Sequence, residues 1–576
     1  MVRSDLDTAL VGRGPQEVAE GDDSVQTPHT PGVPGRRPAV LRPKARSTPA
    51  EGPQYSGRRA TAKLSKLSFA VHQGLIAWFN AVYMADTGTT LLMQRTSVQP
   101  GRPRDAFRAT RLLAAVGVLS VVAVVLPGPD AGLPTEGRLT LVVFTAAVLG
   151  WVLGGLDDTF VGLVAVVALT VAGVLDPAQV FASLGGDIVW LLIGAFVMAA
   201  GLSATGLPAR IAVGLAARAR TVRQLAHLCT AVVVGSALVV PSTAGRAALA
   251  MPVFLALARG LAGRTRVVRA LAVLFPTVIL LSAVATLTGA GAHLITDQLV
   301  TAATGDGIGY GRWLLLGLPF AVVSSHVAAE VVLAVMCRRT DRRTALCLDR
   351  ADVADAAGVT VDGAMSWPQR RALVITGLAV VGWCTSGLHS VPTALVALIA
   401  GLAMCAPRVG TVELSKALGT VPWPLLMFMA TTMLLGTALN SSGAAGWLAG
   451  LLPANPGGSL VWFLAVVVGV SVAAHLVLQS RSARSAVLVP VLIPAAVAAG
   501  LNPAAIAFAS TAAAGFCHTL PASAKPMAVF ATVDDVPTFG KADLARLSVL
   551  LAPLLAVLVI AFALWVWPHL GLPLQH

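Results

Sequence analysis

The feature that most constrains this chain is a succession of long apolar runs between residues 112 and 567. Each run approaches the roughly 20 residues that a helix needs to cross the hydrocarbon core of a bilayer. Hydrophobic residues make up 56% of the 576 residues and charged residues only 12%, well below the charged share of a soluble domain. The sequence therefore predicts an all-α polytopic membrane protein with about eleven transmembrane helices.

The positive charge is placed as in a membrane protein. The net charge of +14 comes from arginines in the N-terminal part and in short loops, such as Arg218–Arg223, Arg264–Arg269 and Arg338–Arg343. Such loops are typically cytoplasmic, whereas a nucleic-acid-binding protein gathers its charge on a soluble domain. We expect a multi-pass protein of the cell membrane, embedded in a lipid bilayer, with a cytoplasmic N-terminus and no nucleic-acid partner.

Composition divides the chain into four parts. Residues 1–105 are rich in proline, glycine and arginine and are predicted to be a disordered basic tail. Part of this tail is untranslated if synthesis starts at Met84. Residues 106–336 and 372–576 are each predicted to form one membrane repeat, and the polar residues 337–371 are predicted to form the loop between them.

Each half contains short apolar runs interrupted by glycine or proline, which are typical of re-entrant hairpins and broken helices. One such run leads into PSTAGR at residues 241–246, and the corresponding run of the second half leads into QSRSAR at residues 479–484. Ser242 and Ser480 occupy the same position in the two segments. The sequence therefore predicts two inverted repeats, each with one re-entrant hairpin.

At these positions the chain resembles the divalent anion:sodium symporter family, whose members move dicarboxylates, citrate or sulfate. That family carries a Ser-Asn-Thr motif at each hairpin tip and a loop resembling Gly-Thr-Pro-Pro-Asn in an unwound helix downstream. Here the tips read STA and SRS, and the downstream loops read LTGAGAH at residues 287–293 and LPASAKPM at residues 520–527. The resemblance covers roughly residues 110–570. It implies a homodimeric secondary transporter of small dicarboxylate-like anions with elevator-type alternating access.

The resemblance also implies where the cargo and the coupling ion bind. The predicted substrate-binding residues are Ser242, Thr243, Ala244, Gly289, Ala290, Ser480, Arg481, Ser482, Ala524 and Lys525. The predicted ion-coupling residues are Ser242, Thr243, Gly289, His293, Ser480, Arg481 and His518. Helix N-termini and hydroxyl groups at these positions suit an anion. No cofactor and no resident metal is expected, and whether Na⁺ is the coupling ion is left open.

Both asparagines of the family motif are replaced, one by Thr243 and the other by Arg481. A guanidinium group supplies a permanent charge and planar donors for a carboxylate. We therefore expect Arg481 to substitute for one sodium ion, so that transport is sodium-independent at that half, and Lys525 to add to the same positive field. Alternatively, Arg481 and Arg484 simply reach a cytoplasmic surface by extending their side chains.

Other interpretations stay open. His326 and Glu330 lie four residues apart on one helical face. They form either a proton relay or a structural hydrogen-bonded pair. A cation/proton antiporter or an arsenite-type exporter of the same superfamily is the alternative function, although such proteins favour carboxylates at the ion site. The sequence has no HExxH or GxSxG motif and no paired intramembrane aspartates, so we expect no enzyme.

Overall fold

The computed structural model describes residues 132–575 apart from 154–155, 347, 362, 451–459 and 534, together with Ala115 and Leu119. All of these belong to the second of two units, Gly101–His576. The tail expected at residues 1–105 lies outside the described residues, as does nearly all of the first membrane repeat up to residue 131.

The described part of the chain is built of helices joined by turns, and no strand occurs in it. The first half contains α3 (Thr135–Leu153), α4 (Asp158–Val171), α5 (Pro177–Ala182), η2 (Ser183–Gly185), α6 (Asp187–Ala204), α7 (Leu207–Ala216), α8 (Val222–Ser236), α9 (Thr243–Gly260), α10 (Thr265–Leu281), η3 (Ser282–Ala285), η4 (Leu287–Gly289), α11 (Gly291–Thr304) and α12 (Tyr310–Met336). The expected linker contains two short helices, α13 (Arg339–Arg343) and α14 (Arg350–Ala356). The second half contains α15 (Trp367–Cys384), α16 (Ser386–His389), α17 (Thr393–Cys405), α18 (Leu414–Leu418), α19 (Trp423–Ser441), α20 (Ala444–Gly450), α21 (Leu460–Ala473), η5 (Ala474–Leu476), α22 (Arg481–Ala498), α23 (Pro503–Ala513), η6 (Pro521–Ser523), α24 (Lys525–Ala531), α25 (Lys541–Ala561), η7 (Phe562–Val566) and η8 (Pro568–Leu570).

The helices have the length and the surface of membrane helices. Seven of the described helical stretches are long and apolar enough to cross a bilayer, and five shorter apolar helices accompany them. Large apolar side chains cover their outer surfaces: Val171 is 69% exposed, Leu378 67% and Val549 73%. So much exposed apolar surface is suited to lipid. The expected all-α membrane fold is confirmed, and the count of about eleven spans stays a prediction.

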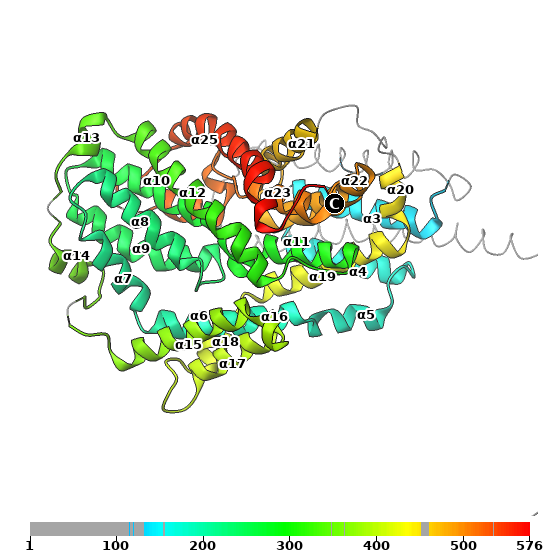
Figure 1. Cartoon of the computed structure of the whole chain (residues 1–576), viewed down its shortest axis with the longest axis horizontal. Helices are drawn as coiled ribbons and strands as arrows, with labels where there is room; N and C mark the ends of the chain where they lie inside the picture. The colour runs from blue at the N-terminus through cyan, green and yellow to red at the C-terminus, as the bar shows by residue number, and fades with distance from the viewer. Residues whose placement is uncertain are drawn as a thin grey trace, which may run out of the picture. The chain divides into compact units, whose positions relative to one another are not determined.

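One group of helices, which we call the scaffold group, comprises α3–α6 and α15–α19. Within it α6, α15, α17 and α18 lie together along the lower edge of Figure 1. Small residues let α6 and α17 approach closely: a Cβ atom on Gly194 would lie 2.5 Å from the carbonyl carbon of Ala397. A Cβ atom on Gly401 would lie 3.0 Å from the carbonyl oxygen of Gly194. Close backbone packing of this kind stabilises helix pairs in membranes, where apolar burial cannot.

A second group, which we call the hairpin group, comprises α8–α12 and α21–α25. Its core surrounds α10, which is almost wholly buried. Phe530 of α24 stacks on Phe275 of α10 with 5.8 Å between ring centroids, and lies 5.4 Å from the ring of Phe254 on α9. The second-half helix α24 is therefore packed on two helices of the first half.

Two helices of the hairpin group are broken at matching places. After α10 the chain passes through η3 and η4 before α11 begins, and after α23 it passes through η6 before α24 begins. Thr286 and Leu520 have backbone angles of −131°, 153° and −130°, 149°. Ala290 and Ala524 have −157°, 151° and −157°, 145°. This likeness supports the predicted duplication, while the inverted relation of the halves stays a prediction.

The helix that follows each break packs against helices of the other half. Helix α11, after the first break, contacts α22 and α23 of the second half, and α24, after the second break, contacts α9 and α10 of the first half. This reciprocal packing brings the backbone breaks of both halves into one region of the hairpin group.

Candidate functional site

The predicted hairpin tips are the N-termini of two helices. Ser242 caps α9, where its Oγ accepts a hydrogen bond of 3.2 Å from the backbone N–H of Gly245. Ser480 caps α22 in the same way, with a bond of 3.3 Å from the N–H of Ala483. Each hydroxyl group keeps its proton for a further acceptor, and each helix N-terminus adds partial positive charge. Thr243, Ala244, Arg481 and Ser482 fill the first turns that follow.

Arg481 points inward and joins the two breaks. Its Nη2 donates to the carbonyl oxygen of Leu280, at 2.6 Å, and to that of Gly515, at 3.0 Å. Leu280 lies at the end of α10 and Gly515 follows α23, so one guanidinium group binds a carbonyl from each half. The alternative in which Arg481 extends to a cytoplasmic surface does not fit this geometry.

Two further arginines occupy matching positions on α9 and α22. Arg246, 1% exposed, donates to Ser282 Oγ at 2.9 Å and to the Ile279 carbonyl at 2.8 Å. Arg484, 0% exposed, donates to the Phe516 carbonyl at 2.9 Å. Both arginines therefore satisfy main-chain carbonyls at the break of their own half, as buried carbonyls require. Arg484 Nε and Nη2 are buried and have no hydrogen-bond partner among the described residues.

The second tip lies against the start of α11. A Cβ atom on Gly291 would lie 2.9 Å from Ser482 Oγ, so the absence of a side chain there admits the tip. Gly289 and Ala290, just before it, are themselves buried. The structure thus brings Arg481 and Ser482 together with the first unwound loop. At the first tip, the side chain of Ser242 accepts its hydrogen bond from Gly245, which belongs to the same half.

Asp158, the first residue of α4, is a candidate site residue that the sequence did not reveal. Its carboxylate lies close to the side chain of Ser480 and within electrostatic range of Lys525. Lys525 is exposed at the start of α24, directly after Ala524. A carboxylate from the scaffold group therefore already occupies the second tip, among the groups that would bind an anionic cargo.

The two histidines predicted for ion coupling are fixed to the unwound segments. His293 is buried, donates from Nδ1 to the Thr286 carbonyl at 3.0 Å, and stacks on Trp313 with 5.2 Å between centroids. His518 is buried, and its Nδ1 accepts a bond of 3.2 Å from the N–H of Cys517. These contacts shape the breaks, and a role for either histidine in ion coupling stays a prediction.

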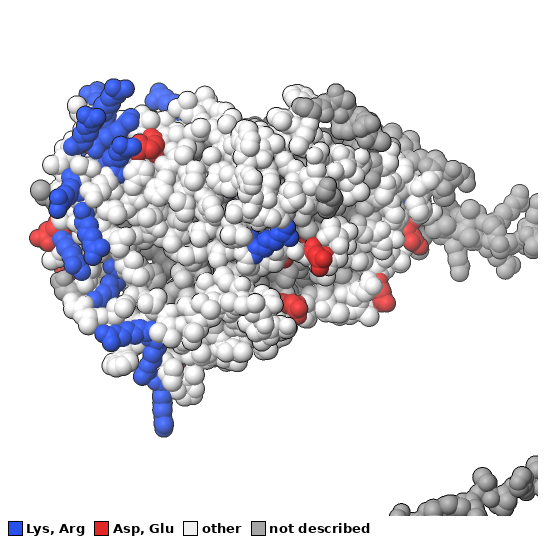
Figure 2. All heavy atoms as spheres, viewed as in Figure 1, with Lys and Arg blue, Asp and Glu red and all other residues white. Residues whose placement is uncertain are grey.

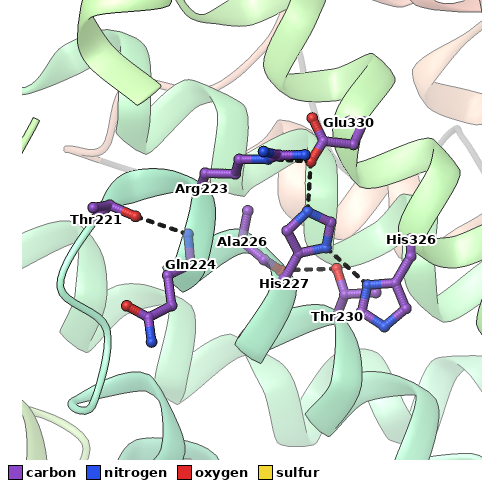
Figure 3. A network of polar contacts seen from close by, with 8 residues as sticks. All are labelled: Thr221, Arg223, Gln224, Ala226, His227, Thr230, His326 and Glu330. Atoms are coloured by element: carbon purple, nitrogen blue, oxygen red, sulfur yellow. Dashed lines mark hydrogen bonds and ion pairs between the residues drawn. The ribbon is translucent and has the colours of Figure 1, made fainter. Parts of the chain in front are cut away.

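His326 and Glu330 are joined through a residue that sequence reasoning missed. Both bind His227 of α8: its Nδ1 lies 2.8 Å from His326 Nδ1 and its Nε2 lies 2.6 Å from Glu330 Oε1. The pair on α12 is thus part of a larger cluster between two helices, shown in Figure 3.

Comparison with known proteins agrees with this architecture. The family model described as the sodium:sulfate symporter transmembrane region matches residues 107–572. A "membrane protein" of Cupriavidus necator is 25% identical over 80% of this chain and 92% of its own length. The sodium-dependent dicarboxylate transporter SdcS of Staphylococcus saprophyticus is 22% identical, over 79% and 91% of the two chains. The citrate/succinate antiporter of Escherichia coli K12 is 26% identical, over 66% and 82%.

A solved structure, the YdaH transporter of Alcanivorax borkumensis, aligns with a TM-score of 0.44 at 17% identity, over 69% of this chain and 89% of its own. The family model, in contrast, covers all the helices and both hairpin tips described above. The resemblance seen in the sequence motifs is thereby confirmed: the chain belongs to the sodium:sulfate symporter family.

Proposed function

We propose that this protein is a secondary active transporter of small dicarboxylate-like anions that needs no sodium ion at the half of its site that holds Arg481. It acts as a homodimer in the cell membrane, with its arginine-rich loops toward the cytoplasm. The hairpin group moves across the membrane against the scaffold group in an elevator-type cycle. The predicted substrate-binding residues at the two tips and two loops bind the anion.

The contents of the site favour an anion. Arg481, Lys525 and the N-terminus of α22 gather positive potential at the second tip, where Ser480 and Ser482 add hydroxyl donors. A buried donor without an acceptor is unfavourable by about 1–3 kcal/mol, and Arg484 has two such donors in the same helix turn. A carboxylate or sulfate oxygen suits these groups, and the curated relatives named for dicarboxylates and for citrate and succinate carry cargo of that kind.

The observation that carries sodium independence is the position of Arg481 Nη2 between the carbonyl oxygens of Leu280 and Gly515. Carbonyls released where a membrane helix unwinds are the groups that hold Na⁺ in transporters of this kind. Here a covalently attached cation occupies that position. A guanidinium group keeps its charge at any physiological pH, so binding of a dianion at this half does not require a sodium ion for charge balance.

Transport by proteoliposomes tests the proposal. Purified protein is reconstituted with unlabelled succinate inside, and uptake of labelled succinate, citrate and sulfate is measured in sodium chloride and in choline chloride. We expect uptake in choline to remain within about two-fold of uptake in sodium. A strict sodium requirement contradicts sodium independence. If sodium instead drives a pH change with no anion uptake, the chain is a cation/proton antiporter.

A further inference from the structure

Four side chains form a polar cluster between the first arm of the first hairpin, α8, and the long helix α12. Arg223 and His227 come from α8, one turn apart, and His326 and Glu330 come from α12, also one turn apart (Figure 3). Arg223 Nε lies 2.6 Å from Glu330 Oε1, the same oxygen that His227 Nε2 approaches at 2.6 Å. The two imidazole rings stack with 5.1 Å between their centroids.

This cluster belongs neither to the hairpin tips nor to the unwound loops, and its members bond to one another. The other charged or titratable side chains on α8, on α12 and on the elements that contact them are Cys229 on α8, Tyr310 and Arg312 on α12, Arg210 on α7, Arg246 and Arg259 on α9, Arg266 and Arg269 on α10, Arg339, Asp341, Arg342 and Arg343 on α13, Cys384, Arg370 and Arg371 on α15, and Lys541, Asp543 and Arg546 on α25. The nearby acidic groups are engaged elsewhere, Asp341 with Arg266 at 3.9 Å and Asp543 with Arg269 at 2.5 Å.

The hydrogen bonds of the cluster fix how many protons it holds. A bond between two Nδ1 atoms contains one proton, so one ring donates and the other accepts. Both contacts are satisfied when His326 donates from Nδ1 to His227 and His227 donates from Nε2 to the ionised Glu330. In that arrangement both rings are neutral, and the charge of Glu330 is balanced by Arg223.

The cluster binds one extra proton without losing a bond. Protonation of His326 at Nε2 leaves its Nδ1 donor in place, so the bond to His227 persists. A second proton converts both rings to imidazolium, and two Nδ1–H groups then face each other at 2.8 Å. Two donors and two positive charges at that distance repel one another. The contact between α8 and α12 therefore depends on the state of protonation.

Water reaches this cluster at the basic end of the hairpin group. The side chain of Arg223 is 63% exposed, that of Glu330 36% and that of His227 30%. Lysine and arginine side chains gather over the same end, where α7, α8, α13 and α14 lie (Figure 2). Protons therefore enter from the face that bears the arginine-rich loops, which is the cytoplasmic face in the function proposed above.

The cluster is mechanically connected to the cargo site because α8 leads directly into the first tip. Five residues, 237–241, join the end of α8 to Ser242, the cap of α9. We propose that His227, His326 and Glu330 form a proton-binding site that ties the first hairpin arm to α12 and thereby holds the first tip in its anion-binding position. The proposal rests on the transport function proposed above. When acidification at the arginine-rich face adds the second proton, the tie opens and the affinity for the anion falls.

The test uses His326→Gln, because a glutamine amide donates to His227 Nδ1 but cannot be protonated. His569→Gln is the matched control, since His569 is exposed in η8. Thermal unfolding of purified protein in detergent is measured at pH 7.5 and pH 5.5. We expect His326→Gln to reduce the fall in Tm on acidification by about 3 °C relative to wild type. The control variant behaves as wild type. If His326→Gln does not fold, His227→Gln, which leaves only one imidazole in the cluster, takes its place and has the same expected result.

Succinate uptake supplies the second measurement. Between pH 7.5 and pH 5.5 the KM of each protein rises by some factor. We expect this factor to be about five times larger for wild type than for His326→Gln, with kcat little changed in either protein. Both proteins meet the same ionic forms of succinate, so the comparison isolates the protein. If the Tm of the variant falls as steeply as that of wild type, the proton site is overturned. If the Tm of the variant falls less on acidification than that of wild type while neither protein transports any anion, the proton site stands and the transport function fails.

Discussion

Arg481 places a permanent positive charge between two main-chain carbonyls, where the family motif has an amide. Its Nη2 donates hydrogen bonds to the carbonyl oxygens of Leu280 and Gly515 at the two backbone breaks. The side chain is therefore a fixed cation rather than a mobile one. In the proposed function, the identity of residue 481 determines whether transport depends on sodium.

We predict that Arg481→Asn makes transport sodium-dependent. The substitution restores a neutral amide and frees the carbonyls of Leu280 and Gly515 for a cation. Uptake of succinate in choline should fall about ten-fold or more, and added sodium should recover much of it, because charge balance at the site then needs an ion. The measurement is proteoliposome uptake against sodium concentration.

The control for that experiment is Arg339→Asn, which removes one exposed arginine from α13. It should leave uptake independent of sodium. Loss of transport by Arg481→Asn with no recovery at any sodium concentration would contradict the substitution of an ion by the side chain.

Asp158 gives a second prediction at a single residue. Its carboxylate lies close to Ser480, so in the proposed function it competes with the anionic cargo for the same groups. Asp158→Asn keeps a hydrogen-bonding side chain and removes the negative charge. We expect the KM for succinate to fall about three- to ten-fold, the effect of one like charge removed from a partly solvated site. Initial-rate kinetics measure it, with Asp306→Asn as the control at an exposed position. An unchanged KM would place Asp158 outside the site.

The pair α6 and α17 shows what a helix contact requires inside a membrane. With no water to exclude, its stability comes from close backbone packing. We predict that Gly194→Val, which forces a side chain against the backbone of Ala397, lowers Tm by about 5 °C or more. Gly377→Ala on α15 meets no atom within 4 Å and should leave Tm unchanged or raise it. Thermal unfolding of both variants decides the matter, and equal Tm values would be inconsistent with tight packing at Gly194.

The apolar runs were enough to predict most of the helices. The apolar run that leads into residues 241–246 corresponds to α8, and the run that leads into residues 479–484 corresponds to α21 and η5. Helix α11 was not predicted because GAHLITDQLVTAAT lacks a long apolar run, and its burial comes from packing against α22 and α23. A helix buried by contacts between the two halves has no hydrophobic signal of its own.

The local structure of the positions that the family motif marks could be predicted from the sequence, whereas their role in binding stays a prediction. Ser242 and Ser480 share one role as helix caps, as their matching contexts suggest. Asp158 was missed because an acidic residue in the first turn of a helix is common, since it interacts favourably with the helix dipole. Such a residue therefore needs no functional explanation. His227 was missed because its partners lie about a hundred residues away, on a helix whose proximity only the fold provides. Contacts between distant elements leave no spacing pattern in one sequence.

The division of the molecule into a scaffold group and a hairpin group gives the last prediction. In an elevator-type cycle the hairpin group moves relative to the scaffold group, so any covalent bond between them stops transport. Asp158 of α4 and Ser480 of α22 meet across this division. We predict that Asp158→Cys with Ser480→Cys, in a background whose six native cysteines are replaced, forms a disulfide that abolishes uptake until it is reduced.

A control disulfide inside the hairpin group distinguishes blocked movement from damage to the protein. Ser471 of α21 and Ser510 of α23 have Oγ atoms 2.7 Å apart, so Ser471→Cys with Ser510→Cys joins two helices of that group. Uptake by this pair should be the same before and after oxidation, because in the proposed cycle the group moves as one body. Uptake that survives a complete disulfide between α4 and α22 would mean that the second tip keeps its place beside Asp158 throughout the cycle. The anion would then cross without displacement of the hairpin group.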